Sequence, residues 1–277
     1  MRIAFADLDG TLLTTQKTVS TATFSALDEL ARVGIELVPC SGRPFVGLPP
    51  EVLAHPAVRH AVCASGALVY DVASDGSMGA VLHAEPIERA SVLALYDALH
   101  ARDLLFDVFT PTHVYMERER YDHMADYIPD RHFLPQLEAM RTPTDVSLPE
   151  LIERLGTDEP VVRATVYWRQ RPDRDLAVSL IDADPELTWV NSMSINLEIS
   201  SARATKGAAL VWLCGHLGIP VAESVAFGDS GNDVTMLEAA GDGVAMGNAL
   251  PVASAVADHE TASNDEDGVA AYLRSLL

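Results

Sequence analysis

Short apolar runs alternate with helical patterns at the start of the chain. An apolar run at 3–8 leads into Asp-Gly-Thr, and residues 20–34 place apolar side chains at helical spacing behind Ser20, a residue suited to an N-cap. Apolar runs at 35–40 and 59–65 predict the next strands, and each is followed by a loop that contains glycine. This order of strand, helix and strand predicts a parallel sheet with crossover helices.

The pattern changes in the middle of the chain. Residues 68–85 predict a hairpin that turns at Asp75-Gly76. Beyond it, strands follow one another in pairs, without strict alternation with helices. The predicted helices lie at 86–101, about 119–128 and 171–184, and the predicted strands at 104–110, 113–118, 161–168, 187–192 and 195–200. Such pairing predicts a separate α+β module with an antiparallel sheet.

From Thr205 the alternation of helices and strands resumes. The predicted helices lie at 205–217, 231–240, 250–257 and about 267–276, and the predicted strands at 223–227 and 242–246. The predicted fold class is therefore α/β, with a Rossmann-like parallel-sheet core interrupted by the α+β module. We predict that residues 1–85 and 189–277 form the core, and that residues 86–188 form the insert.

The composition is that expected of two folded domains inside a cell. The chain has 277 residues, 48 % of them hydrophobic, which is enough for two cores. Cys40, Cys63 and Cys214 form no CxxC pair and are odd in number, which argues against a disulfide framework or a zinc site. The N-terminal apolar run is too short for a signal peptide, and no run approaches the ~18 apolar residues of a membrane span. We therefore expect a cytoplasmic protein.

The net charge limits the partners of the protein. Its formal value is −21 at pH 7, so nucleic acid and an anionic membrane surface are not expected as partners. A small phosphate ester remains a suitable ligand, provided that a metal cation and a few local donors outweigh the overall negative field.

Two acidic motifs follow predicted strands near opposite ends of the chain. In DLDGT, Asp7 and Asp9 are spaced i and i+2, so both are expected on one side at the end of the strand, where α/β sheets bind ligands. In VAFGDSGND, Asp229 and Asp233 follow a second strand. A turn or a helix cap accounts for either motif alone. Together, four carboxylates after two strands indicate a cage for a hard cation, Mg²⁺.

Two further residues are suited to holding an anion. Lys206 lies in the first turn of a predicted helix, where its charge opposes the helix dipole unless an anion binds there, and phosphate is the anion that we expect. Ser41 follows the strand at 35–40, where a hydroxyl and backbone N–H groups can hold phosphate oxygens. A surface lysine and an ordinary Ser-Gly turn remain the simpler explanations for each residue taken alone.

Taken in order, these motifs resemble a known family. DLDGTLL, SGRP at 41–44, the Lys-Gly pair at 206–207, GDSGNDVTML and GNA at 247–249 are similar to those of the haloacid dehalogenase (HAD) superfamily of phosphohydrolases. The similarity is greatest to the Cof-type branch, which carries a type IIB α+β cap inserted after the third core strand. This chain departs from the branch at Ser65, which precedes Gly-Ala where the branch often has Asn. Substrate positioning at that point is therefore expected to differ.

The resemblance implies a role for each acidic residue. Asp7 would attack phosphorus and form an aspartyl-phosphate, and Asp9 would protonate the leaving alcohol and then activate water. Mg²⁺ would be held by the Asp7 carboxylate, the main-chain carbonyl of Asp9 and Asp229, with Asp233 supporting this shell.

The resemblance also implies a phosphate-binding set. The phosphoryl oxygens would be held by Ser41, Gly42, Lys206 and Asn232. Arg43 has two explanations of equal weight, since it could reach the substrate or pair with an acid of the core.

The inserted cap would close over the site, exclude water and set specificity. Its polar candidates for that role are His113, Tyr115, Glu117, His123, Arg163 and Tyr167, none of which the sequence singles out. Trp168 and Trp189 are expected in the core of the cap and not on a stacking surface.

The leading function is a Mg²⁺-dependent phosphatase that acts on a small phosphorylated metabolite, such as a sugar phosphate or a phosphorylated cofactor. A phosphomutase would use the same two aspartates and return the phosphoryl group to its substrate. A non-catalytic sensor of a phosphorylated metabolite is a third hypothesis, disfavoured because all four acidic positions are intact. The sequence leaves the oligomeric state open.

Overall fold

The chain forms two compact units. The computed structural model describes residues 1–131, 134–191 and 193–277. Met1–His83 and Thr205–Leu277 form one unit, here called the core unit, and Ala84–Ala204 form the inserted unit. The second division follows residue 204 and not residue 188, where the sequence placed it. The reason is that the strands between these positions pair within the inserted unit.

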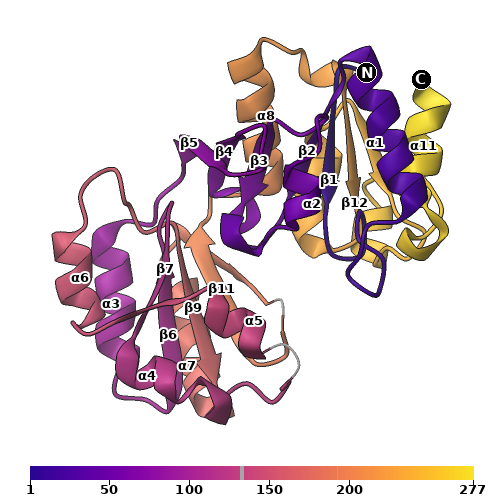
Figure 1. Ribbon diagram of the computed structural model, residues 1–277. Coiled ribbons are helices and arrows are strands. Elements are labelled where there is room, and N and C mark those ends of the chain that lie inside the picture. Colours follow the sequence, from indigo (N-terminus) through magenta and orange to yellow (C-terminus); the bar gives the residue numbers. More distant parts are fainter. Residues whose placement is uncertain (132–133, 192) are drawn as a thin grey trace. The chain divides into compact units, whose positions relative to one another are not determined.

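The core unit is built on an eight-stranded sheet in the order β14-β13-β12-β1-β2-β3-β4-β5 (Figure 1). The strands from β14 to β3 are parallel, as predicted, and β4 runs antiparallel to β3. Its strands are β1 (Ile3–Asp7), β2 (Glu36–Cys40), β3 (His60–Cys63), β4 (Leu68–Val72), β5 (Met78–Ala84), β12 (Ser224–Gly228), β13 (Asp242–Ala245) and β14 (His259–Glu260).

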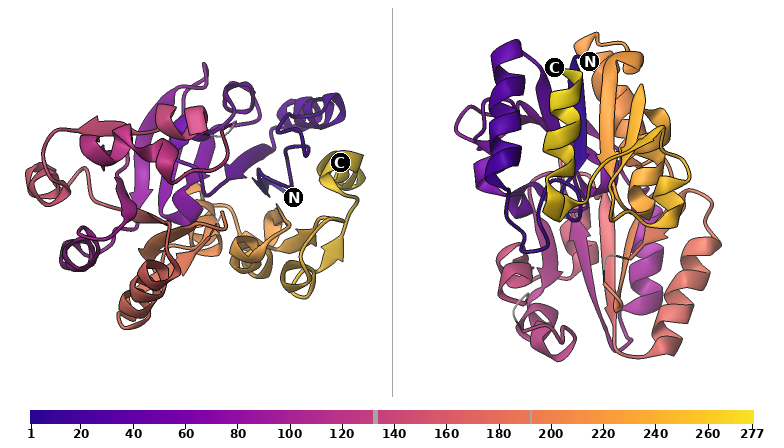
Figure 2. Two further views of the ribbon diagram at one scale, coloured as in Figure 1. Left: turned by 90° about the horizontal axis from the view of Figure 1, so that it is seen from below. Right: turned by 90° about the vertical axis from the view of Figure 1, so that its right-hand side faces the viewer.

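Helices cover this sheet. They are α1 (Thr21–Val33), α2 (Pro50–Leu53), α8 (Lys206–Leu217), α9 (Val234–Ala239), α10 (Pro251–Ser254) and α11 (Gly268–Leu276). As predicted, α1 follows Ser20, whose hydroxyl accepts the Thr23 N–H. Apolar residues of α8 and α9 pack on the sheet face that carries Ile3 and Phe5, while α1 and α11 lie side by side (Figure 2). Because side chains alternate along a strand, Asp7 projects from β1 to the same face as Phe5, toward α8.

The inserted unit has a six-stranded sheet in the order β10-β11-β9-β6-β7-β8. Its strand pairs are antiparallel, as expected, except that β7 and β8 are parallel. The strands are β6 (Leu104–Phe109), β7 (Val114–Glu117), β8 (Thr142–Thr144), β9 (Arg163–Trp168), β10 (Leu187–Val190) and β11 (Asn196–Ser201).

The two faces of this second sheet are covered differently. The helices are α3 (Arg89–Leu99), α4 (Arg118–Asp122), α5 (Leu134–Ala139), α6 (Leu148–Arg154) and α7 (Arg171–Asp182). Helices α3, α6 and α7 bury one apolar face, to which the predicted core residues Trp168 and Trp189 add part of their surface. Residues of α5 and of the segment after α4 cover the other. The predicted helix at 119–128 is divided, because α4 ends at Asp122 and a short 3-10 helix follows.

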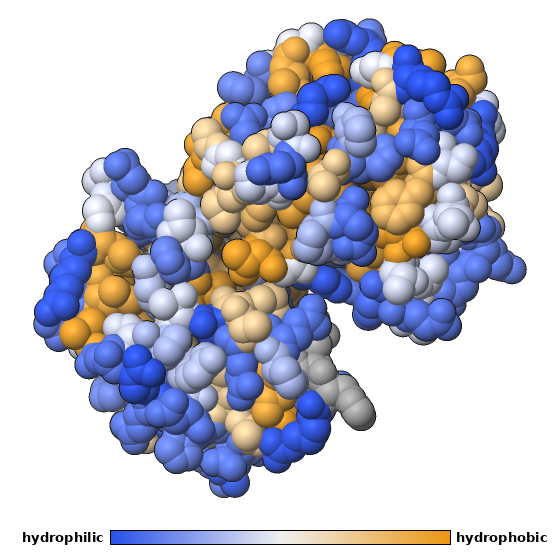
Figure 3. Space-filling view, viewed as in Figure 1, coloured by the Kyte–Doolittle hydropathy of each residue, from blue (hydrophilic) through white to orange (hydrophobic). Residues whose placement is uncertain are grey.

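Hydrophilic residues make up most of the surface seen in Figure 3, in keeping with the net charge of −21. Within the described ranges, every helix is too short or too polar to cross a membrane.

Candidate active site

Three of the predicted site residues meet at one edge of the core sheet. Strand β1 lies between β12 and β2, with Asp7 paired to Cys40 and Ala6 to Phe227. Asp7 is the last residue of β1, Ser41 follows β2, and Asp229 follows β12. The parallel register therefore brings both ends of the sequence to the carboxyl end of the same sheet.

Lys206 joins two of the acidic residues. It is fully buried, and its Nζ lies 2.5 Å from Oδ1 of Asp7 and 2.6 Å from Oδ1 of Asp233. The helix that carries it begins after Thr205, whose hydroxyl accepts the Ala208 N–H. The sequence pointed to phosphate as the anion that balances Lys206; in the structure, the protein's own carboxylates do so.

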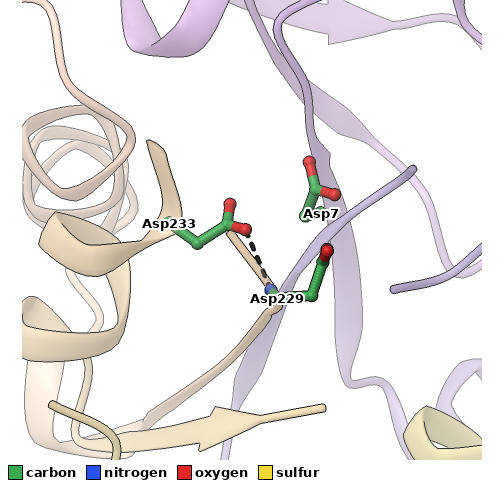
Figure 4. A group of neighbouring side chains, drawn as sticks. All are labelled: Asp7, Asp229 and Asp233. Carbon is green, nitrogen blue, oxygen red and sulfur yellow. Dashed lines mark hydrogen bonds between the residues drawn. The ribbon is translucent and has the colours of Figure 1, made fainter. Parts of the chain in front are cut away.

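Three carboxylates form a compact acidic group, drawn in Figure 4. Asp7, Asp229 and Asp233 each offer an oxygen, and these oxygens lie within 4.8 Å of one another. Asp229 Oδ1 accepts the Thr11 hydroxyl at 2.9 Å. Both oxygens of Asp233 are engaged, one by Lys206 and the other by the backbone N–H groups of Asp229 and Ser230. Asp233 is therefore held through both of its oxygens and supports the group, whereas Asp7 and Asp229 are the better candidates for direct contact with a cation.

The electrostatics of this group favour a bound cation. One lysine faces three carboxylates. Burial raises the pKa of Asp7 to about 8. The negative charges of Asp233 and Asp229 add to this rise, and the positive charge of Lys206 opposes it. Burial and the charge of Asp233 raise the pKa of Asp229 to about 6. A divalent ion would offset the excess negative charge and favour the ionised carboxylates, and a set of oxygen donors suits a hard cation.

Asp9 lies apart from this group, which corrects the expected cage of four carboxylates. Strand β1 ends at Asp7, so its alternation of side chains does not extend to Asp9. The Asp9 carboxylate instead accepts hydrogen bonds from Arg43 and from Lys17. Burial raises the pKa of Asp9, but the bonds and charges of Arg43 and Lys17 outweigh this and lower the pKa overall.

The turn after β1 needs glycine at position 10. Its φ is +92°, and a Cβ there would lie 2.6 Å from Oδ2 of Asp229. Asn248 donates from Nδ2 to the Gly10 carbonyl at 2.8 Å, so the GNA loop also contributes to this turn. The absence of a side chain at Gly10 lets the Asp229 carboxylate lie directly against the turn that follows Asp9.

The residues predicted to hold phosphate lie in two loops at this edge. Ser41 is buried, and its hydroxyl accepts the Arg43 N–H at 3.1 Å. Gly42 follows it and is partly exposed. Asn232 lies in the turn between Asp229 and α9, where its Oδ1 accepts the Ser230 hydroxyl at 2.7 Å.

A left-handed turn supports the Ser41 loop from β3. Ala64, Ser65 and Gly66 have φ values of 50°, 58° and 104°. The Ser65 N–H donates to the Ser41 carbonyl at 3.0 Å, and a Cβ at Gly66 would collide with the Thr205 carbonyl at 2.2 Å. Within the described chain, the buried Ser65 hydroxyl has no hydrogen-bond partner. The residue that departs from the family pattern is thus in a conformation that non-glycine residues rarely adopt.

The sequence did not single out Lys17 and Thr11. Lys17 lies in a polar turn with φ 61°, and nothing in its sequence surroundings relates it to Asp9. Thr11 belongs to the DLDGT motif, which was the available signal. For Arg43, the structure shows one of the two expected contacts, a pair with an acid of the core unit, Asp9.

The structure also sorts the polar candidates of the inserted unit. Glu117 accepts the Tyr96 hydroxyl and the Leu148 N–H, and Tyr167 accepts a bond from Arg141, so these two support the fold. Arg163 is buried and pairs with Glu198 at 3.0 Å. The other three candidates are more accessible. His113, in the loop before β7, and His123, after α4, are exposed, and Tyr115 in β7 is partly exposed.

Comparisons with known proteins agree with this arrangement. The family described as haloacid dehalogenase-like hydrolase matches residues 4–273. Phosphatase YwpJ of Bacillus subtilis is 32 % identical, with 100 % of both chains covered. Pyridoxal phosphate phosphatase YbhA of Escherichia coli is 27 % identical, over 100 % of this chain and 98 % of its own. A solved structure of a haloacid dehalogenase-like hydrolase from B. subtilis has a TM-score of 0.78 and 31 % identity, with 100 % of both chains covered.

Proposed function

The chain belongs to the haloacid dehalogenase-like hydrolases and is a phosphatase, and we propose that it hydrolyses phosphate monoesters of small metabolites with Mg²⁺ through an aspartyl-phosphate. The observation that carries this proposal is the buried Asp7 carboxylate, which lies beside Lys206 and within the acidic group at the end of β1. A carboxylate in such a position can act as a nucleophile, because the neighbouring cations stabilise charge on the transferring phosphoryl group.

The first half of the reaction transfers the phosphoryl group to the protein. An oxygen of Asp7 attacks phosphorus, and the bond from phosphorus to the leaving alcohol oxygen breaks. Asp9 gives its proton to that oxygen, so that a neutral alcohol departs. Lys206, Asn232 and the loop of Ser41 and Gly42 hold the phosphoryl oxygens.

The second half releases inorganic phosphate. Water attacks the phosphorus of the aspartyl-phosphate while the Asp9 carboxylate takes its proton, and the bond from phosphorus to Asp7 breaks. Asp9 begins this half as the carboxylate left by the first half, which is the form that accepts a proton.

Mg²⁺ would be held by the carboxylates of Asp7 and Asp229 and the main-chain carbonyl of Asp9, and when bound it neutralises charge on the phosphoryl group. Asp233 orients this shell through its bonds to Lys206 and to the backbone of Asp229 and Ser230.

Small phosphorylated metabolites are the proposed substrates. The relative from E. coli is named for pyridoxal phosphate, a phosphorylated cofactor. The net charge of −21 supports a small ester over a polyanion, because local positive charge such as that of Lys206 and a metal can attract one phosphoryl group against the overall negative field.

The test is a phosphate-release screen with sugar phosphates, pyridoxal phosphate and p-nitrophenyl phosphate, with Mg²⁺ and with EDTA. Wild type is expected to release phosphate only with the metal, and Asp7→Asn is expected to release none. Equal release by wild type and Asp7→Asn would refute the proposal. Conversion of a substrate to a phosphorylated isomer would identify a phosphomutase, and tight binding without turnover a sensor.

A further inference from the structure

Arg43 is attached to the proposed acid and base by two bonds. Its Nε lies 2.9 Å from Oδ2 of Asp9, and its NH2 lies 2.7 Å from Oδ1. A guanidinium that meets both oxygens of a carboxylate fixes the orientation of that carboxylate as well as its distance.

The Arg43 side chain is itself held in place. Its NH1 donates to the Gly47 carbonyl at 2.9 Å, and only 21 % of its side chain is exposed. Each of its three nitrogens therefore already has an acceptor within the protein. Its backbone N–H donates to the Ser41 hydroxyl, so the residue that fixes Asp9 also belongs to the proposed phosphate loop.

The contact with Arg43 matters because the Asp9 side chain is accessible to solvent. Its side chain is 37 % exposed, whereas that of Asp7 is 7 % exposed. A solvent-accessible carboxylate two residues beyond the buried nucleophile can reach water, but without the Arg43 contact it is free to rotate. Lys17 contacts a single oxygen, at 2.7 Å, from a side chain that is 59 % exposed, and such a contact restrains little.

We propose that Arg43 is a positioning residue, which holds the Asp9 carboxylate where it takes a proton from the water that hydrolyses the aspartyl-phosphate. This inference rests on the proposed function. It adds a residue that acts on the second half of the reaction through Asp9 and does not contact the substrate.

The test compares wild type and Arg43→Gln with p-nitrophenyl phosphate and Mg²⁺. Because p-nitrophenolate leaves without needing a proton, the first half of the reaction does not depend on Asp9, and the second half limits turnover. Arg43→Gln is expected to lower kcat by about 10- to 100-fold, as for loss of positioning of a general base, and to leave kcat/KM within about threefold. A burst of p-nitrophenol, equal to the enzyme concentration, is expected as the aspartyl-phosphate accumulates.

Three controls separate positioning from other effects. In an Asp9→Ala background, Arg43→Gln is expected to lower kcat by no more than about threefold further, because its effect passes through Asp9. Lys17→Met also removes a positive charge from Asp9 but only a one-point contact, so it is expected to lower kcat less than Arg43→Gln does. Arg43→Lys keeps the charge but not the two-point contact, and its kcat is expected between those of wild type and Arg43→Gln.

Different results would contradict the positioning role of Arg43 and the proposed function. A fall in kcat/KM without a burst would mean that Arg43 contacts the substrate, and an equal loss in the Asp9→Ala background would mean that it acts independently of Asp9. Crystal structures of wild type and Arg43→Gln provide a check that needs no substrate, because an unmoved Asp9 carboxylate in the variant overturns the inference. Lack of phosphate release by wild type would instead refute the proposed function.

Discussion

A buried cation bonds a buried carboxylate in each unit, but the charge balance differs. In the core unit, Lys206 faces Asp7 and Asp233, with Asp229 in the same acidic group. In the inserted unit, Arg141 donates from Nε to Oδ2 of a single carboxylate, that of Asp107, at 2.8 Å, and its NH2 lies 2.7 Å from the same oxygen. The inserted network is balanced within itself, whereas the core group has an excess of negative charge.

The surroundings of the Arg141 pair extend this difference. Arg141 also donates to the Leu137 carbonyl and the Tyr167 hydroxyl, so its contacts join α5 and β9 to β6. Burial raises the pKa of Asp107, and the charge of Arg141 opposes it. Burial likewise raises the pKa of Asp7, to about 8, against Lys206, but here the negative charges of Asp233 and Asp229 add to the rise. A balanced buried pair serves the fold, while an unbalanced one indicates a site that is completed by a ligand.

The largest expected effect is the loss of activity in Lys206→Met. Removal of this cation takes away a positive charge that stabilises the transferring phosphoryl group, and about a 10³-fold loss of kcat is expected, as for other buried electrostatic donors. Steady-state phosphate release with Mg²⁺, on protein shown to be folded by circular dichroism, provides the measurement. A loss of less than tenfold would mean that the buried lysine is structural, like Arg141.

Arg141→Met is expected to lower the stability of the protein and not to act directly on its catalysis. It leaves the Asp107 carboxylate buried without its partner, which costs about 3–5 kcal/mol of unfolding free energy. The double variant Asp107→Leu/Arg141→Met removes both charges and is expected to recover most of this loss. Urea unfolding of the three proteins checks the order. If the double variant is as unstable as the single one, the network contributes more than charge balance.

The difference between the two units also explains what could be predicted from the sequence. Strands, helices and their order in the core follow from apolar periodicity and from caps such as Ser20, and the acidic motifs directly follow strands. Because parallel strands align their ends, Asp7 and Asp229 could be brought together without coordinates.

Other features depend on contacts between residues far apart in the sequence. The bond from Lys17 to Asp9 arises because a turn with positive φ directs the lysine back, and no periodicity encodes that. The boundary after residue 204 depends on pairing of β11 with β9, and one apolar strand resembles another in sequence. Asp107 and Arg141 are charged residues that the sequence would place at a surface; only the fold shows that they are partners.

The next effect in size is stabilisation by Mg²⁺. If a cation neutralises the excess negative charge of the acidic group in the core unit, Mg²⁺ at 100 times its Kd raises the unfolding free energy by about 2.7 kcal/mol. Asp229→Asn is expected to remove most of this gain, while Asp107→Asn, a matched change in the balanced network, is expected to retain it. Thermal unfolding with Mg²⁺ and with EDTA distinguishes them. Equal gains in wild type and Asp229→Asn would place the ion elsewhere.

The pH dependence of the metal-free protein follows from the same group. The pKa of Asp7 is about 8 in the folded protein, against the ordinary aspartate value of 3.8 that applies to the unfolded chain, so the folded state binds the extra proton between these values. The contribution of Asp7 to stability is therefore present near pH 4 and is lost as the pH rises toward 8. The unfolding free energy of wild type in EDTA is expected to fall relative to that of Asp7→Asn over this range. A difference that rises with pH would contradict the raised pKa.

The smallest expected effect concerns the backbone beside the Ser41 loop. Ser65 has φ 58° and ψ 28°, a left-handed conformation that Asn adopts more readily than Ser. Ser65→Asn is therefore expected to raise the unfolding free energy by up to about 0.5 kcal/mol, a rise of about 1–2 °C in Tm. Ser65→Ala is the control for the hydroxyl, which is buried without a partner among the described residues, so a gain in Ser65→Ala equal to that in Ser65→Asn would assign the effect to the hydroxyl and not to the backbone. If Ser65→Asn is less stable than wild type, the space around the side chain, and not its backbone preference, determines the residue at this position.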